Sequence, residues 1–288
     1  MSKNMKRKLS AYAELVTISF MQTPMISIGL GLLCSSEISP SQNSPSIITL
    51  IFAFTGMVLV LAHIMVLNDY FDVEIDKKKD QIQTLTEIPR RVAGILATVF
   101  LSLGLLFAWL TSATYFIISF ALALLSAAYS APPIRYKEIY PFSTVGESTG
   151  AFLLFWAGYS LSAPLDLRAI LVSLIPFLVL VVWRLKHEIR YMMFDKETGK
   201  KTLAVVHGAH KVKLLVRLCY LSIFALTIGL FITGWFSATF LFFLLVFLGL
   251  VGLVSVSSSA RTLWYKASAK NYWGFIFFFA VVAWILFS

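Results

Sequence analysis

The chain has 288 residues, of which 59% are hydrophobic and 13% are charged, and its mean hydropathy is +0.84. Soluble globular domains carry roughly 25% charged residues, so this composition excludes a soluble fold and predicts an all-α, polytopic membrane protein. The net charge of +10 would suggest a nucleic-acid partner in a soluble protein. In a membrane protein, Lys and Arg gathered in cytoplasmic loops explain it, so the expected surroundings are a lipid bilayer and no nucleic acid.

Nine apolar windows approach or reach the length of about 17–25 residues that crosses a bilayer. They are Leu15–Cys34, Ile47–Leu67, Val92–Thr111, Tyr115–Ser130, Phe142–Leu161, Leu167–Val182, Leu214–Phe236, Thr239–Ser257 and Tyr272–Phe287. We therefore expect nine transmembrane helices.

The distribution of Lys and Arg supports this topology. If the N-terminus faces the cytoplasm, all of the 24 Lys and Arg residues except Arg168 fall on the cytoplasmic side. An eight- or ten-span topology would destroy this alternation. The protein is thus expected to be a multi-pass integral membrane protein, of the inner membrane if bacterial, with its chemistry on the cytoplasmic side.

An acidic stretch follows the second window directly. On a helix, Asn68, Asp69, Asp72 and Asp76 fall within about 100° of one another. Uncompensated charge at a membrane boundary is costly, and carboxylates on one face need a cation. Hard oxygen ligands suit magnesium, which also takes phosphate oxygens of substrates. The stretch predicts a magnesium–diphosphate site. The alternative is a solvated acidic helix end whose negative charge is offset by the three lysines at 77–79.

A second acidic stretch follows the sixth window. Glu188 and Asp195 are seven residues apart and share a helix face, with Tyr191 between them. Gly199 is expected to end this helix, and Lys201 follows as a donor for phosphate oxygens. A second magnesium could bind here; the alternative is an amphipathic helix of mixed charge.

The spacing of the two acidic stretches, four spans apart, suggests a duplication. It would place two half-sites facing each other across a central cavity, although the echo rests on position more than on identity. We expect one domain over residues 1–288, made of two pseudo-repeated four-helix halves and a ninth helix.

The loop between the fourth and fifth windows is basic. Pro132 and Pro133 stop the preceding helix and favour an extended turn. Arg135 and Lys137 alternate with apolar residues, so both would point the same way in an extended segment. They suit a phosphate clamp, with Arg as a bidentate fork and Lys as a point charge. The alternative is ordinary positive-inside charge.

Together, these loops resemble the UbiA superfamily of intramembrane prenyltransferases. The family's NDxxDxxxD motif is matched in full by residues 68–76, and the trailing part of its second motif is matched from Asp195 on. Glu188 and Tyr191 stand where that motif commonly has Asp. The YSxPPxRxK loop at residues 129–137 resembles branches that prenylate chlorophyllides and glyceryl phosphates.

The resemblance implies a nine-helix bundle around a central cavity open to the bilayer. It also implies magnesium-dependent transfer of a prenyl group from a prenyl diphosphate to a small aromatic or polar acceptor. The implied catalytic residues are Asp69, Asp72 and Asp195; the substrate-binding residues are Asn68, Arg135, Lys137, Tyr191 and Lys201; the metal ligands are Asn68, Asp72, Asp76, Glu188 and Asp195.

Two other functions remain open. A terpene cyclase or prenyl diphosphatase would ionise the same substrate without a separate acceptor. A transporter should carry its acids in mid-span, where only Glu147, near the start of the fifth window, comes close.

Overall fold

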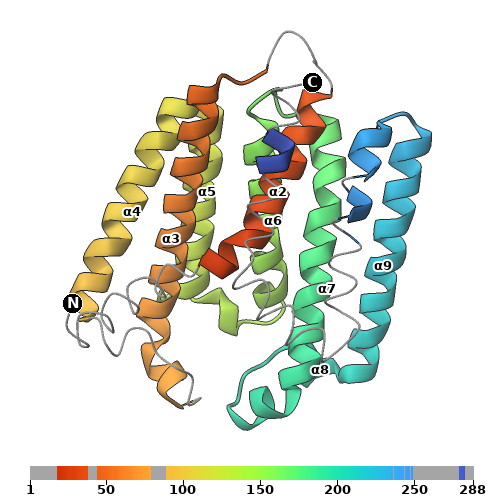
Figure 1. The fold of residues 1–288 in the computed structure, drawn as a ribbon. Coiled ribbons are helices and arrows are strands. Elements are labelled where there is room, and N and C mark those ends of the chain that lie inside the picture. Colours follow the sequence, from red (N-terminus) through yellow and green to blue (C-terminus); the bar gives the residue numbers. More distant parts are fainter. Residues whose placement is uncertain are drawn as a thin grey trace, which may run out of the picture. The chain divides into compact units, whose positions relative to one another are not determined.

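A computed structural model describes residues 18–37, 44–78, 89–235, 237–242, 244–246, 248 and 279–282, without the side chains of 18–23 and 73–78. Every regular element in these ranges is a helix (Figure 1). The chain forms two compact units. Unit 1 is Met1–Met21 with Ser46–Arg135, and unit 2 is Gln22–Pro45 with Tyr136–Ser288.

Unit 1 is built from three packed helices, α3 (Ile47–Lys78), α4 (Arg90–Thr111) and α5 (Ala113–Ser130) (Figure 1). Gly56 on α3 and Gly104 on α4 allow the two backbones to approach closely. A Cβ added at Gly56 would lie 3.1 Å from the Gly104 carbonyl oxygen. Small residues at a helix crossing are the usual means of close packing in membranes, where burial of apolar surface supplies little driving force.

Unit 2 is organised around α7, which packs against α6, α8 and α9 (Figure 1). Its elements are α2 (Ile18–Ser36, from Gln22 on), the short 3₁₀ helix η2 (Tyr136–Glu138), α6 (Phe142–Tyr159), α7 (Leu167–Glu197), α8 (Leu203–His207) and α9 (Ala209–Ile232).

The backbones of α2 and α6 touch at two glycines. A Cβ added at Gly158 would lie 2.0 Å from the Ile28 carbonyl oxygen, and one at Gly31 would lie 2.0 Å from the Phe155 carbonyl oxygen. Neither position has room for a side chain, so these glycines set the distance between the two helices.

The prediction of an all-helical, polytopic membrane fold is confirmed. Each of the first seven windows overlaps a helix of the described residues, and α3, α4, α5, α7 and α9 are long and apolar enough to cross a membrane. The helices α3 and α7 run past the predicted ends of their windows, so both acidic stretches begin on helices. The last two windows lie mostly outside the described residues. Nine spans, a single domain and a cytoplasmic N-terminus therefore stay predictions.

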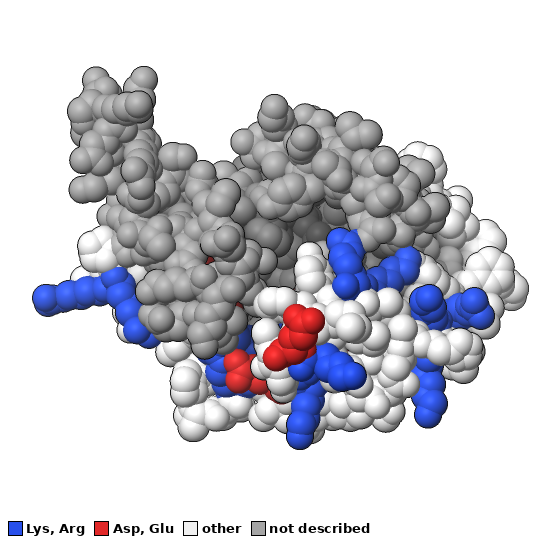
Figure 2. All heavy atoms as spheres, turned by 90° about the horizontal axis from the view of Figure 1, so that it is seen from below, with Lys and Arg blue, Asp and Glu red and all other residues white. Residues whose placement is uncertain are grey.

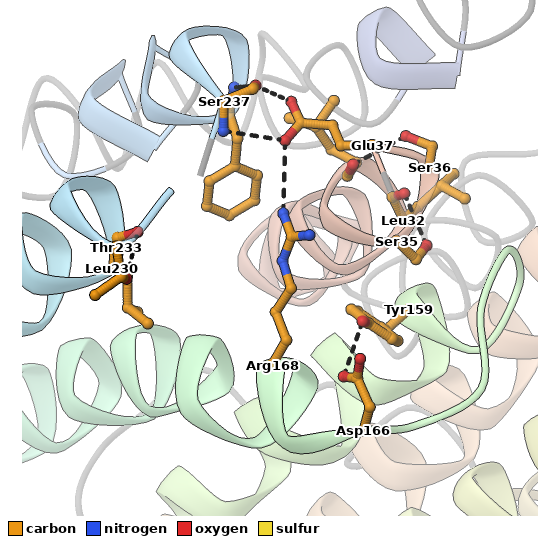
Figure 3. Close-up of polar contacts among 12 residues, drawn as sticks. Leu32, Ser35, Ser36, Glu37, Tyr159, Asp166, Arg168, Leu230, Thr233 and Ser237 are labelled. Carbon is orange, nitrogen blue, oxygen red and sulfur yellow. Dashed lines mark hydrogen bonds and ion pairs between the residues drawn. The ribbon is translucent and has the colours of Figure 1, made fainter. Parts of the chain in front are cut away.

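Arg168, the exception to the charge pattern, belongs to a polar cluster in unit 2 (Figure 3). Its Nη2 lies 3.9 Å from Oε2 of Glu37, and the two side chains are only 18% and 8% exposed. Glu37 also accepts hydrogen bonds from the hydroxyl and the backbone N–H of Ser237. Nearby, Asp166 caps the start of α7 and accepts a hydrogen bond from Tyr159. The charge of Arg168 is thus balanced locally.

Candidate active site

The first acidic motif lies on α3 in unit 1, where Asn68, Asp69 and Asp72 are half-buried. The Ser130 hydroxyl, at the end of α5, donates a hydrogen bond to Oδ1 of Asn68 at 3.0 Å. Nη2 of Arg135 donates to Oδ1 of Asp72 at 2.8 Å, forming an ion pair. The structure therefore brings together three of the predicted site residues, Asn68, Asp72 and Arg135.

Arg135 is held by more than its ion pair. Its Nη1 donates to the carbonyl oxygens of Ser130 at 3.0 Å and Phe71 at 3.3 Å. The guanidinium is thus fixed between the motif on α3 and the end of α5. Hydrogen bonds to two elements orient it more firmly than the ion pair alone would, because each contact restricts the long side chain further.

The prediction that Arg135 and Lys137 lie on an extended segment is wrong. The backbone N–H of Arg135 bonds to the carbonyl of Ala131 at 2.9 Å, closing a turn, and Arg135 has a φ of +38°. Lys137 follows in the 3₁₀ helix η2 and is buried. A turn closed by local hydrogen bonds has no two-residue side-chain alternation, so the strand argument does not apply.

The residues of the first motif suit magnesium by their chemistry. Asn68 and Asp72 offer oxygen donors from one face of α3, with Cβ atoms one turn apart at roughly 5–6 Å. Asp76 follows one turn later, and its side chain lies outside the described residues. Among the side chains that the structure does describe, no group of three or more His, Cys, Asp or Glu is placed to hold a metal ion. The use of the Asn68 amide and the Asp76 carboxylate as further ligands of this motif stays a prediction.

The second acidic motif lies on the last turns of α7 in unit 2. Glu188 and Asp195 are both buried, as expected for residues that share a face. Tyr191 is 41% exposed instead, and its ring centroid lies 4.5 Å from that of His187. The helix ends at Glu197, just before Gly199, which has a φ of +75°. The predicted helix end is therefore confirmed.

The carboxylates of this motif have different surroundings. Glu188 accepts hydrogen bonds from the Thr144 hydroxyl at 2.6 Å and from the backbone N–H of Leu203 at 2.9 Å. Oδ1 of Asp195 lies 4.0 Å from Nζ of Lys200. Thr144 was not among the predicted site residues, because it lies in an apolar window and only packing brings it to Glu188.

An ion pair joins α6 to α7 near this motif. Nη1 of Arg184 lies 3.0 Å from Oε2 of Glu147, and its Nε lies 3.6 Å from Oε1 of Glu188. Glu147, the acid nearest to mid-span, is thus engaged within the protein.

Burial, with a further contribution from the charge of Glu147, raises the pKa of Tyr136 to about 12, so this phenol stays protonated at neutral pH.

Exposed cations are numerous on one face of the molecule. The face in Figure 2 shows many more Lys and Arg side chains than acidic ones. In unit 2, the exposed cations include Arg190, Lys196, Lys201, Lys211 and Lys213. Such a surface attracts anionic substrates such as diphosphates.

Comparison with known families assigns the chain. The model of the UbiA prenyltransferase family matches residues 26–285. The chain belongs to this family. The predicted resemblance is therefore confirmed, and the protein is a prenyltransferase by family.

Two curated relatives are both 4-hydroxybenzoate octaprenyltransferases. A 4-hydroxybenzoate octaprenyltransferase of Pseudomonas fluorescens (strain SBW25) is 26% identical over 266 residues, covering 84% of this chain and 83% of the relative. Another, of Stutzerimonas stutzeri (strain A1501), is 25% identical over 202 residues, covering 66% of this chain and 64% of the relative. The chain thus matches less than two thirds of the length of this second relative.

Solved UbiA structures share the fold. A UbiA homologue from Archaeoglobus fulgidus, bound to DMAPP and Mg²⁺, has a TM-score of 0.72 at 16% identity, covering 96% of this chain and 99% of that one. A homologue from Aeropyrum pernix K1 has a TM-score of 0.69 at 16% identity, covering 93% and 98%. These likenesses confirm a UbiA-like helical fold; the roles of individual residues stay predictions.

Proposed function

We propose that this protein transfers a prenyl group from a prenyl diphosphate to a small aromatic acceptor in the membrane and releases diphosphate with the help of Mg²⁺. The observation that carries the proposal is the arrangement of Asn68, Asp72 and Arg135 in unit 1. Oxygen donors suited to a divalent cation stand directly beside a guanidinium suited to an anion. A magnesium–diphosphate group needs both.

The proposed metal ligands are Asn68, Asp72 and Asp76 from the first motif and Asp195 from the second. Bound magnesium would neutralise the charge that develops on the departing diphosphate. Asp69, half-buried beside Asn68 on α3, keeps its proposed role of orienting the first motif.

The proposed diphosphate contacts are cations. Arg135 is oriented by its bonds to Asp72, Ser130 and Phe71, and its planar fork matches phosphate oxygens. Lys201 is exposed in the turn after α7, where an anion can reach it, whereas Lys137 is buried and can act only near its present place. Positive groups placed before the reaction begins stabilise a leaving anion at little cost in reorganisation.

Two observations guide the choice of acceptor. Both named relatives are 4-hydroxybenzoate octaprenyltransferases, so phenolic acids are the first class to test. Tyr191 is exposed on α7, with its ring 4.5 Å from that of His187 and tilted by 39°, and it is the proposed aromatic contact for an acceptor ring.

The test is an acceptor screen with purified protein in lipid nanodiscs. Labelled prenyl diphosphates of several chain lengths are incubated with Mg²⁺, with and without 4-hydroxybenzoate and other phenolic acids, and a chelator serves as the control. The proposal expects labelled acceptor that forms only when both Mg²⁺ and the acceptor are present. A cyclised or hydrolysed prenyl product that forms equally without acceptor would identify a cyclase or diphosphatase instead.

A further inference from the structure

Glu188 matches the place of a magnesium ligand in the sequence motif, but protein groups enclose its carboxylate. The side chain is 1% exposed. Its Oε2 accepts a hydrogen bond from the backbone N–H of Leu203, and its Oε1 accepts a short one, 2.6 Å, from the Thr144 hydroxyl. Nε of Arg184 lies 3.6 Å from the same Oε1. Each oxygen therefore already faces a donor.

These contacts leave Glu188 poorly suited to a metal ion. Each carboxylate oxygen keeps a lone pair beside its hydrogen bond, so what opposes a metal here is enclosure: with 1% of the side chain exposed, a magnesium ion at Oε1 or Oε2 would have to push aside the packed groups around it. Asp72 also accepts from a guanidinium, but its side chain is 17% exposed and so leaves room for a metal ion. A magnesium ion at Glu188 would also stand close to the guanidinium of Arg184, and like charges repel strongly where water is scarce.

Asp195, seven residues later on α7, has different surroundings. Its carboxylate makes no hydrogen bond with the residues that the structure describes, and the nearest cation there, Nζ of Lys200, lies 4.0 Å away. Asp195 can therefore accept a metal without breaking a hydrogen bond. Metal binding would therefore disturb existing contacts at Glu188 but no hydrogen bond at Asp195.

The contacts of Glu188 fix the turn that follows α7. The Lys200 N–H bonds to the Asp195 carbonyl at 2.8 Å, which holds the beginning of the turn. Thr202 caps α8, and the next residue, Leu203, donates to Glu188. Lys200 and Lys201 lie between these two attachments. Leu203 and Ala204 also pack in the apolar cluster formed by α7 and α9, so the bond from Glu188 adds a directional polar attachment to an apolar one.

We propose that Glu188 is a positioning residue and not a magnesium ligand. It ties α6 and the start of α8 to α7, and so holds Lys200 and Lys201 at a fixed place beside Asp195. This role rests on the proposed function, because it gives the turn a diphosphate to bind. The second motif then contributes one metal-binding carboxylate, Asp195, together with a fixed cationic turn.

The test compares Glu188→Gln, Glu188→Ala and Thr144→Val. A glutamine can keep both hydrogen bonds, because its carbonyl oxygen can accept from Leu203 while its NH₂ donates to the Thr144 hydroxyl. Alanine removes both, and Thr144→Val removes one without touching the carboxylate. Affinity for Mn²⁺ in the presence of inorganic diphosphate is measured by electron paramagnetic resonance. Hydrogen exchange in peptides containing Leu203 reports on the turn.

A positioning role predicts that Glu188→Gln keeps Mn²⁺ affinity and the KM for prenyl diphosphate within about threefold of the unmodified protein. Glu188→Ala should raise that KM about tenfold or more, with a smaller change in kcat, and should speed exchange at Leu203. Thr144→Val should shift KM and exchange in the same direction, and its effect should not add to that of Glu188→Ala, because both act on one contact.

A metal ligand would behave differently. Glu188→Gln would then lose tenfold or more in Mn²⁺ affinity, as Glu188→Ala does, while Thr144→Val would keep it; that pattern would overturn the proposal. The metal and exchange measurements need no turnover. If the protein makes no prenylated product, the proposed function is refuted. The metal-affinity and exchange measurements would still decide the role of Glu188. If Glu188→Ala fails to fold, Glu188→Gln and Thr144→Val decide it.

Discussion

A single added methyl group at Gly158 should push α2 and α6 apart. Its Cβ would lie 2.0 Å from the Ile28 carbonyl oxygen, whereas carbon and oxygen atoms in contact are ordinarily about 3.3–3.6 Å apart. The deficit of about 1.3 Å cannot be relieved by a side-chain rotation, because the obstructing atom belongs to the backbone. Overpacking costs about 1–3 kcal/mol, and a backbone obstruction favours the upper end, about 3 kcal/mol.

The assay is thermal unfolding of the purified protein in detergent. A change of 1 kcal/mol shifts Tm by roughly 2–4 °C in chains of 150–250 residues, so Gly158→Ala should lower Tm by about 6–12 °C. The control is Gly229→Ala on α9, where nothing lies within 4 Å of the added Cβ. That variant should keep or raise Tm, because Ala is favoured over Gly in a helix by about 1 kcal/mol.

The result that would refute this reasoning is an unchanged Tm for Gly158→Ala. It would mean that α2 and α6 do not meet backbone to backbone. Gly31→Ala, which faces the Phe155 carbonyl oxygen at the same distance, should destabilise similarly. The double variant should cost less than the sum of the two, because both substitutions open the same helix crossing.

Three further predictions concern charges and the second motif. Asp72→Ala should lower kcat about 100-fold or more in protein that still elutes as a folded species, and near-normal turnover would reject Asp72 as a metal ligand. Arg168→Met and Glu37→Gln should each lower the free energy of unfolding by about 1–3 kcal/mol, since the partner stays behind mostly buried; strict additivity in the double variant would show that the pair does not interact. Tyr191→Asp should keep or raise Mg²⁺ affinity, measured from the Mg²⁺ dependence of Tm, and a large fall would assign Tyr191 a positive role.

The helices and the first motif could be predicted from the sequence because both depend on local patterns. Transfer of an apolar segment into a bilayer is a sum over its own residues, so the first seven windows overlap helices of the described residues. The i, i+4 spacing of Asn68 and Asp72 likewise follows from the helix repeat. The predicted windows are shorter than α3 and α7, because polar residues end an apolar window without ending a helix.

What the tertiary structure decided is which groups face one another. The pairing of Arg135 with Asp72, of Arg168 with Glu37 and of Glu188 with Thr144 joins positions 44 to 131 residues apart. Periodicity assigns a residue to a face of its own helix, but carries no information about the residue opposite. Glu188 shows the consequence: its spacing from Asp195 is that of a metal-binding pair, whereas its partners on α6 and at the start of α8 make it a buried anchor.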